Sequence, residues 1–215
     1  MITPQQRSRS PEGGFTLVEL SVAAFLSTLV LSAVVLIFNS VSRGASDAAS
    51  RGDLQMQARE VITEIAAELR SAEAPRLSAT AVESLSSSVL IFHTDRYPAA
   101  GPERIVYERT SCVGGYCQLR VRRYAANPAS GPNWTYQTVP FNDVVLLDRV
   151  SAGNTLFSGR VWSGTPSRLT TVASCGGATK CLFPIVAIDL QAAAPAGNSL
   201  AGPFGVFVEV NLRNA

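Results

Sequence analysis

The chain has 215 residues, of which 47% are hydrophobic and 16% are charged, and its formal net charge is +2. This length suffices for one ordinary globular domain with an appendage, and the apolar content excludes a wholly disordered chain. The 18 basic and 16 acidic residues nearly balance, which excludes the strong basic excess typical of nucleic-acid-binding domains. Charge alone therefore indicates no particular partner.

The first predicted element is an uncharged apolar run from Leu20 to Phe38. As a helix rising about 1.5 Å per residue, this run is roughly 28 Å long, close to the thickness of the hydrocarbon core of a bilayer. Arg7 and Arg9 precede it, so the positive-inside tendency places the N-terminus in the cytoplasm and the remaining chain outside. A signal peptide is the alternative, but its apolar core is only about 7 to 15 residues long. The length favours a single-pass protein of the cytoplasmic (inner) membrane.

Beyond the uncharged run the helical pattern continues but becomes one-sided. Apolar residues recur every three or four positions from Leu54 to Leu69, and charged residues take most of the positions between them. Gly44 and Gly52 weaken the middle of the pattern, and Pro75 predicts its end. We therefore expect one helix from Phe15 to Ala74, about 90 Å long, of which half protrudes from the rest of the protein.

After the helix, short β-rich runs alternate with stretches rich in turn-forming residues. These runs predict strands that begin at Val89, Arg104, Tyr116, Trp134, Asp143, Leu156, Pro184 and Phe204. In the last run valines alternate with other residues, which is typical of a sheet with one face on the core. The predicted fold class is α+β, in which a long N-terminal helix, transmembrane in its first half, packs on an antiparallel β-rich head.

The four cysteines fall into two local pairs, Cys112 with Cys117 and Cys175 with Cys181, each spanning two consecutive glycines. Four cysteines can pair in three ways, and the short spacing favours the two local disulfides. A zinc site is the alternative, but these spacings fit zinc ligands poorly, and the one histidine, His93, is not beside either pair. Disulfides predict an oxidising compartment outside the cytoplasm for this part of the chain.

A carboxylate, Glu19, stands at the start of the apolar segment, directly after the sequence from Gly13 to Val18. Charged residues cost about 2.5 to 3.5 kcal/mol at the centre of a bilayer and less near its edge, so Glu19 requires a partner. The candidates within the chain are the two arginines before the apolar run, or the amine of Phe15 if the chain were cut after Gly14. Otherwise the side chain would only extend to the cytoplasmic lipid headgroups.

The stretch from Gly14 to Glu19 resembles the prepilin cleavage and methylation motif of type IV pilins and of the pseudopilins of type II secretion. In that family a short basic leader ends in glycine and is followed by Phe-Thr-Leu-(Val/Ile)-Glu. The resemblance implies that a membrane-embedded prepilin peptidase cuts between Gly14 and Phe15 and methylates the new amine of Phe15, which keeps its positive charge. It also implies that Glu19 pairs with the Phe15 amine of a neighbouring subunit in a helical filament.

The resemblance implies four parts: a leader peptide (1–14), a transmembrane and filament-core half of the helix (15–41), an amphipathic half (42–74) and a β-rich head (75–215). Two stretches of the head, Arg104 to Tyr124 and Val144 to Trp162, are similar to paired segments of W-class minor pilins and J-class minor pseudopilins. This likeness implies a low-copy subunit near the filament tip that helps to start assembly. Its partners would be the peptidase, other major and minor subunits, the inner-membrane assembly platform and, before assembly, membrane lipid.

The sequence holds little support for an enzyme. His93 and Asp95 stand at the end of an expected strand, without the further residues that a catalytic motif or a metal site requires. A lone histidine is usually a surface or core residue. We therefore predict no catalytic activity, no metal and no cofactor.

Binding of DNA is an alternative for the head. Arg120 and Arg122 lie near two tyrosines, a combination that could hold DNA phosphates, as in some competence pilins. However, strand alternation places Arg123 on the opposite face, which favours an ordinary solvated strand. A membrane-anchored binding or adhesin domain that never enters a filament is the remaining class of function.

Overall fold

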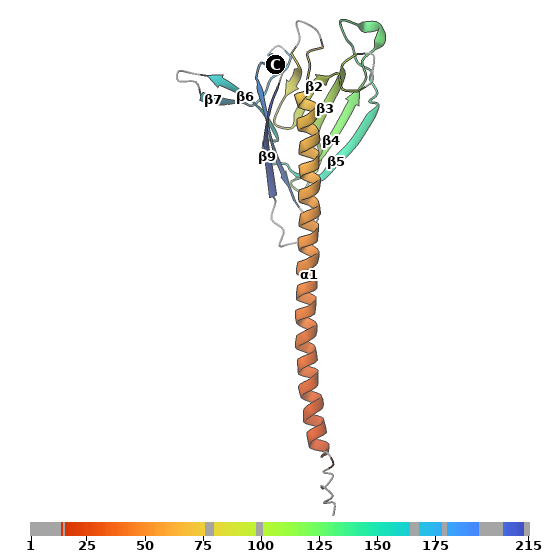
Figure 1. The fold of residues 1–215 in the computed structure, drawn as a ribbon, viewed down its shortest axis with the longest axis vertical. Coiled ribbons are helices and arrows are strands. Elements are labelled where there is room, and N and C mark those ends of the chain that lie inside the picture. The colour runs from red at the N-terminus through yellow and green to blue at the C-terminus, as the bar shows by residue number, and fades with distance from the viewer. Residues whose placement is uncertain are drawn as a thin grey trace, which may run out of the picture. The chain divides into compact units, whose positions relative to one another are not determined.

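The structure is a computed structural model that describes residues 14, 16–75, 80–97, 101–163, 168–177, 180–193 and 204–212. In this part of the chain a long helix, α1 (Leu17–Arg70), precedes nine strands and a short 3-10 helix, η1 (Pro128–Ser130). The chain divides into two compact units, Met1–Ser46 and Asp47–Ala215, so that α1 contributes to both (Figure 1). The fold class is α+β.

In the first unit, every described side chain of α1 from Leu17 to Ser46 is exposed. By length and composition α1 is the one helix among the described residues that is suited to cross a membrane. The hydroxyl groups of Ser27, Thr28 and Ser32 each donate a hydrogen bond to the backbone carbonyl one turn earlier. These bonds satisfy polar groups that would otherwise be costly in an apolar environment.

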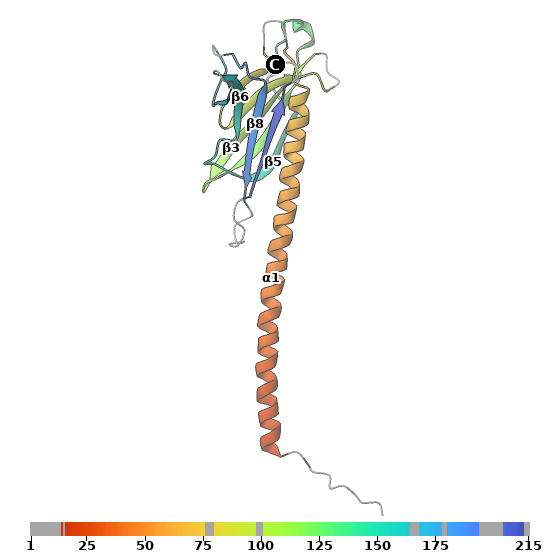
Figure 2. The same ribbon diagram turned by 60° about the vertical axis from the view of Figure 1, so that its left-hand side comes forward.

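In the second unit, one face of α1 packs on the sheet, as Figure 2 shows. The buried apolar residues of this face recur every three or four positions, as expected for an amphipathic helix: Ala58, Val61, Ile62, Ile65, Ala66 and Leu69. The helix ends at Arg70, earlier than Pro75 predicted. Ala72 already pairs with Thr94, and the Glu73 N–H donates to the His93 carbonyl at 2.9 Å, so strand pairing replaces the helical hydrogen bonds.

The nine strands form one antiparallel sheet. Their order is β1-β2-β3-β4-β5-β8-β6-β7, and β9 also pairs with β8. Their bounds are β1 (Val82–Leu85), β2 (Val89–Thr94), β3 (Glu103–Val113), β4 (Tyr116–Tyr124), β5 (Asn142–Ser151), β6 (Phe157–Ser163), β7 (Arg168–Val172), β8 (Ile185–Ala192) and β9 (Phe204–Asn211). Between β5 and β8 the register includes only Val150 opposite Ala192. The sheet therefore has two well-paired groups of strands that diverge at this junction.

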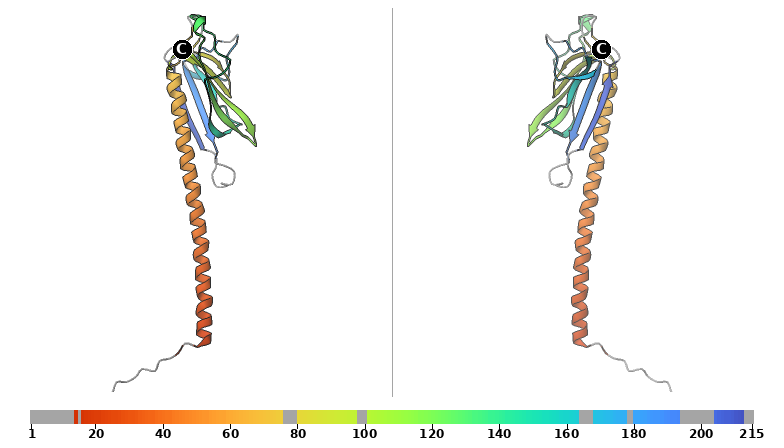
Figure 3. Two further views of the ribbon diagram at one scale, coloured as in Figure 1. Left: turned by 90° about the vertical axis from the view of Figure 1, so that its right-hand side faces the viewer. Right: turned by 90° about the vertical axis from the view of Figure 1, so that its left-hand side faces the viewer.

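The sheet curls so that its first strand meets the segment that follows β7. Leu85 of β1 and Cys175 exchange two backbone hydrogen bonds, at 3.0 and 2.9 Å, and the Leu156 N–H donates to the Ser87 carbonyl. Figure 3 shows the green strands β3 and β4 at an angle to the blue strands β8 and β9. The core lies between the curled sheet and α1, and its largest fully buried side chains include Tyr107, Phe92, Phe157, Ile65 and Leu69.

The strand prediction was wrong in three places. The run at Trp134 is part of the β4–β5 connection, where Tyr136 makes one isolated bridge with Ala126. The Trp134 ring occupies space beside Gly101 and Gly131, where an added Cβ would come within 2.7 and 2.8 Å of it. The aromatic ring of Trp134 therefore packs within loops and not in a strand. The short strands β1 and β7 were not predicted, because each is defined by its pairing with β2 or β6.

Candidate functional site

The start of α1 has a reciprocal cap formed by Thr16 and Glu19. The Glu19 N–H donates to the Thr16 hydroxyl oxygen at 3.2 Å, while the Glu19 carboxylate accepts from the Thr16 N–H and from its hydroxyl, both at 3.0 Å. This arrangement is a capping box, which satisfies backbone donors that the first turn of a helix leaves free. Thr16 is thus a neutral partner of Glu19 that a search for a nearby cation does not find, although the capping-box pattern Thr-x-x-Glu is visible in the sequence.

The predicted processing site lies immediately before this cap. Gly14 is exposed, and a Cβ added to it would meet no described atom within 4 Å. Phe15 lies outside the described residues, as do Arg7 and Arg9. Cleavage between Gly14 and Phe15, and pairing of Glu19 with an amine, therefore stay predictions.

A second carboxylate, Glu68, lies near the other end of α1 and is fully buried. It accepts hydrogen bonds from the hydroxyl groups of Tyr97 and Tyr107, each at 2.6 Å. It also accepts from Nε and Nη2 of Arg123 on β4, at 3.1 and 2.8 Å. Four donors from the sheet and from the β2–β3 connection thus surround one carboxylate of the helix, which compensates the cost of burying its charge.

Arg123 also binds residues that are nearer the surface than Glu68. Its Nη2 also donates to Glu64, one turn earlier on α1, at 2.6 Å, and its Nη1 donates to the Asn142 side chain at 2.9 Å. Burial lowers the pKa of the Arg123 guanidinium, but the charge of Glu68 outweighs burial and raises that pKa above its ordinary value. Burial and the Glu68 carboxylate together raise the pKa of Tyr97 to about 12. At neutral pH the group therefore keeps charged Arg123 and protonated tyrosines.

The structure contains both local disulfides, Cys112–Cys117 and Cys175–Cys181. The first closes the β3–β4 hairpin, whose turn includes Gly114 and Gly115 at positive φ, a conformation that glycine adopts without strain. The second joins Cys175 and Cys181 in the segment between β7 and β8, where Cys175 pairs with Leu85 of β1. Each disulfide therefore restrains one local loop, in agreement with the interpretation of the cysteine spacing.

The two arginines considered for DNA binding both have carboxylate partners. Arg120 lies 3.4 Å from Asp143 on β5, and Arg122 lies 2.5 Å from Glu108 on β3. Arg123 is buried on the opposite face of β4, as strand alternation predicted. These ion pairs balance the charge of both candidate side chains, which weakens any attraction for phosphates.

His93 is a core residue, with only 4% of its surface exposed. Its Nε2 lies 3.3 Å from Glu83, its ring stacks on Tyr136, and Arg104 forms two further hydrogen bonds with Glu83. Partial burial raises the pKa of Glu83, but His93 and Arg104 outweigh this effect and lower it to about 2. Asp95 is exposed, and no cluster of three or more potential metal ligands occurs among the described residues.

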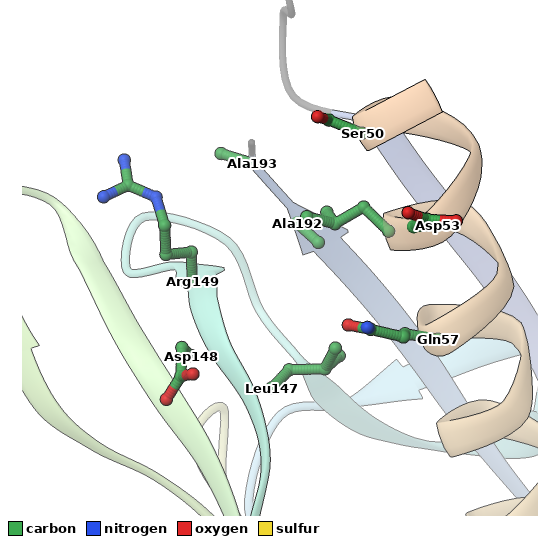
Figure 4. Close-up of a pocket in the computed structure, with 9 residues that line it drawn as sticks. Ser50, Asp53, Gln57, Leu147, Asp148, Arg149, Ala192 and Ala193 are labelled. Atoms are coloured by element: carbon green, nitrogen blue, oxygen red, sulfur yellow. The ribbon is translucent and has the colours of Figure 1, made fainter. Parts of the chain in front are cut away.

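A cavity of about 300 Å³ lies between the second half of α1 and the ends of β5 and β8 (Figure 4). Asp148 and Arg149 point away from α1, since Asp148 accepts a hydrogen bond from Gln118 and the Arg149 guanidinium stacks on Tyr116. Gln57 extends from α1 toward β5 and Leu147. The charged groups of the lining therefore do not converge on one point, as those of an active site would.

Comparisons of the chain with protein-family models, with curated proteins and with solved structures each gave no match.

Proposed function

We propose that this protein is a minor subunit of a type IV pilus or of a type II secretion pseudopilus. The observation that carries the proposal is the start of α1. An apolar helical segment, exposed on all sides from Leu17 to Val41, follows the Gly14-Phe15 processing motif and holds one carboxylate in its first turn. A helix of this kind suits both a bilayer and the core of a filament made of similar helices.

The position of Glu19 favours a filament subunit over a simple anchor. An anchor needs only apolar residues, and a carboxylate in it raises the free energy of insertion. In a filament the same carboxylate gains a role, because processing would create an ammonium group on Phe15. Pairing the two groups across neighbouring subunits compensates both charges and selects one register between adjacent helices.

The capping box suggests how Glu19 is held before assembly. In the isolated chain Thr16 satisfies the carboxylate through neutral hydrogen bonds, and the N-terminal end of the helix dipole favours a negative charge at this position. During assembly the ammonium of a neighbouring subunit would add a charged partner. The charged partner would stabilise the carboxylate more than the neutral one, which would favour transfer of the helix from the membrane into the filament.

The head supports the assignment to a minor subunit. Of the two stretches that resemble W-class and J-class proteins, the first spans the β3–β4 hairpin, and the second spans β5 and β6, which are consecutive in the chain but not paired with each other. The head is also large for the repeating subunit of a filament. In this proposal the N-terminus faces the cytoplasm, the head lies outside, and the subunit helps to initiate or tip the filament.

The test is the mass of the mature N-terminus, measured on protein isolated from cells with and without the prepilin peptidase. We expect a chain that begins at methylated Phe15 only when the peptidase is present. A chain that keeps Met1, or one cut near Ala45, would contradict the proposal and favour an anchored or secreted binding domain.

A further inference from the structure

The stretch from Ser42 to Asp53 differs from the rest of α1 in composition. Its only apolar side chains are alanines, and its remaining residues are glycine, serine, aspartate and arginine. The stretch is helical throughout, yet none of its side chains is buried, although Asp47 and Ser50 are partly covered. The boundary between the two compact units, at Ser46 and Asp47, falls inside it.

Packing does not explain the two glycines of this stretch. A Cβ added to Gly44 or to Gly52 would meet no described atom within 4 Å, so there is room for a side chain at both positions. Glycine is the poorest helix former after proline, and serine and aspartate compete for the backbone hydrogen bonds of a helix. Asp47 stands four residues from both Arg43 and Arg51, which supports the helix only slightly.

The flanking parts of α1 have more support than this stretch, in which Ser50 and Asp53 only line the cavity beside β5 and β8 and no side chain is buried. The apolar run from Leu20 to Phe38 suits lipid, and the face from Ala58 to Leu69 packs on the head. An isolated helix of about a dozen residues is marginally stable in water even with good helix formers. We propose that Ser42–Asp53 is a built-in opening segment, which unwinds and reforms in water while the helix on either side stays intact.

Such a segment gives the chain an adjustable length. Its twelve residues span about 18 Å as a helix and up to about 40 Å when extended. The chain could then lengthen at this place without unfolding of the head. This inference requires that Leu20–Phe38 lies in a membrane, but it does not depend on filament assembly.

The test is hydrogen–deuterium exchange of the full chain in lipid nanodiscs, followed by mass spectrometry of peptides. In the native chain, amides of Ser42–Asp53 should exchange at least a hundredfold faster than those of Ala58–Leu69. The variant Gly44→Ala/Gly52→Ala should slow exchange in this stretch about twentyfold, the factor that two glycine-to-alanine helix propensities predict. Thr63→Ala, on the exposed face of the packed half, is the matched control and should leave the stretch unchanged.

Two results would overturn the proposal. One is protection of Ser42–Asp53 in the native chain as strong as that of Ala58–Leu69. The other is fast exchange that the double alanine variant does not slow, which would show that helix propensity does not control the opening. Neither result bears on processing at Gly14, so failure of this inference is distinguishable from failure of the proposed function.

Discussion

The two halves of α1 belong to one continuous helix but have different surroundings. From Leu17 to Ser46 all described side chains are exposed, whereas from Ala58 to Leu69 one face is buried in the head. Each half also holds a carboxylate at a critical position. Glu68 has four donors from its own chain, but Glu19 has only Thr16 among the described residues. The packed face of the second half is covered by its own chain, whereas no described side chain of the first half is buried by the described residues.

The largest expected effect concerns the charge of Glu19. Glutamine can also close a capping box, so Glu19→Gln should keep the helix cap and membrane insertion while removing the charge. If Glu19 pairs with an ammonium, incorporation into filaments should fall about a hundredfold or more, because that ammonium would be left uncompensated. The measurement is quantitative immunoblotting of sheared filaments and of membrane fractions.

Thr16→Ala is the matched control for this experiment. It removes the cap but keeps the carboxylate, and loss of a cap costs about 0.5 to 2 kcal/mol. Its incorporation should therefore fall much less than that of Glu19→Gln. Normal incorporation of Glu19→Gln together with a defect in Thr16→Ala would show that Glu19 acts only as a cap.

The next largest effect concerns Glu68 in the packed half. Glu68→Ala would remove the acceptor shared by buried Arg123, buried Tyr107 and half-buried Tyr97, so the head should lose about 3 to 5 kcal/mol of unfolding free energy. Denaturant unfolding of the full chain in detergent, followed by tryptophan fluorescence, measures this change. Glu64→Ala removes a partly exposed partner of the same arginine and should cost about 1 kcal/mol or less. Equal losses in the two variants would contradict a special role for the buried carboxylate.

The disulfides should have intermediate effects that are confined to the head. Removal of a disulfide around so short a loop costs about 2 kcal/mol by chain entropy. We expect Cys175→Ser/Cys181→Ser to cost more than Cys112→Ser/Cys117→Ser, because Cys175 pairs with β1 and the other disulfide closes an exposed hairpin turn. Thermal unfolding measured by circular dichroism ranks the two variants. The opposite ranking would show that the bridge from β1 to Cys175 contributes little.

The smallest effect is a pH dependence from Glu83. Its pKa is about 2 in the folded protein, against an ordinary value of 4.5, so its stabilising contribution is present above pH 4.5 and is lost as the pH falls toward 2. Because 39% of the side chain is exposed, solvent screening reduces this contribution to about 1 kcal/mol. Unfolding free energies of the native chain and of Glu83→Gln, measured between pH 2 and 6, should converge at the acidic end. Parallel curves would contradict the assignment.

Sequence patterns predicted the features that depend on neighbouring residues. The apolar run, the amphipathic period and the alternation of β4 arise from local geometry, so the long helix and the opposite faces of Arg122 and Arg123 could be predicted. The local cysteine pairs follow from short spacing in the same way. The end of α1 could not be predicted, because it depends on the pairing of Ala72 with a strand far along the chain.

The sequence by itself determined that α1 has an apolar half, an amphipathic half and a carboxylate at its start. Only the tertiary structure decided which glutamate of the amphipathic half is buried. Glu60, Glu64 and Glu68 recur at intervals of one turn, and nothing local distinguishes them. Glu64 shares only Arg123 with Glu68, whereas Glu68 also meets Tyr97 and Tyr107. These residues come from distant positions and converge only when the sheet folds against the helix. Burial of a charge depends on donors that the whole fold brings together.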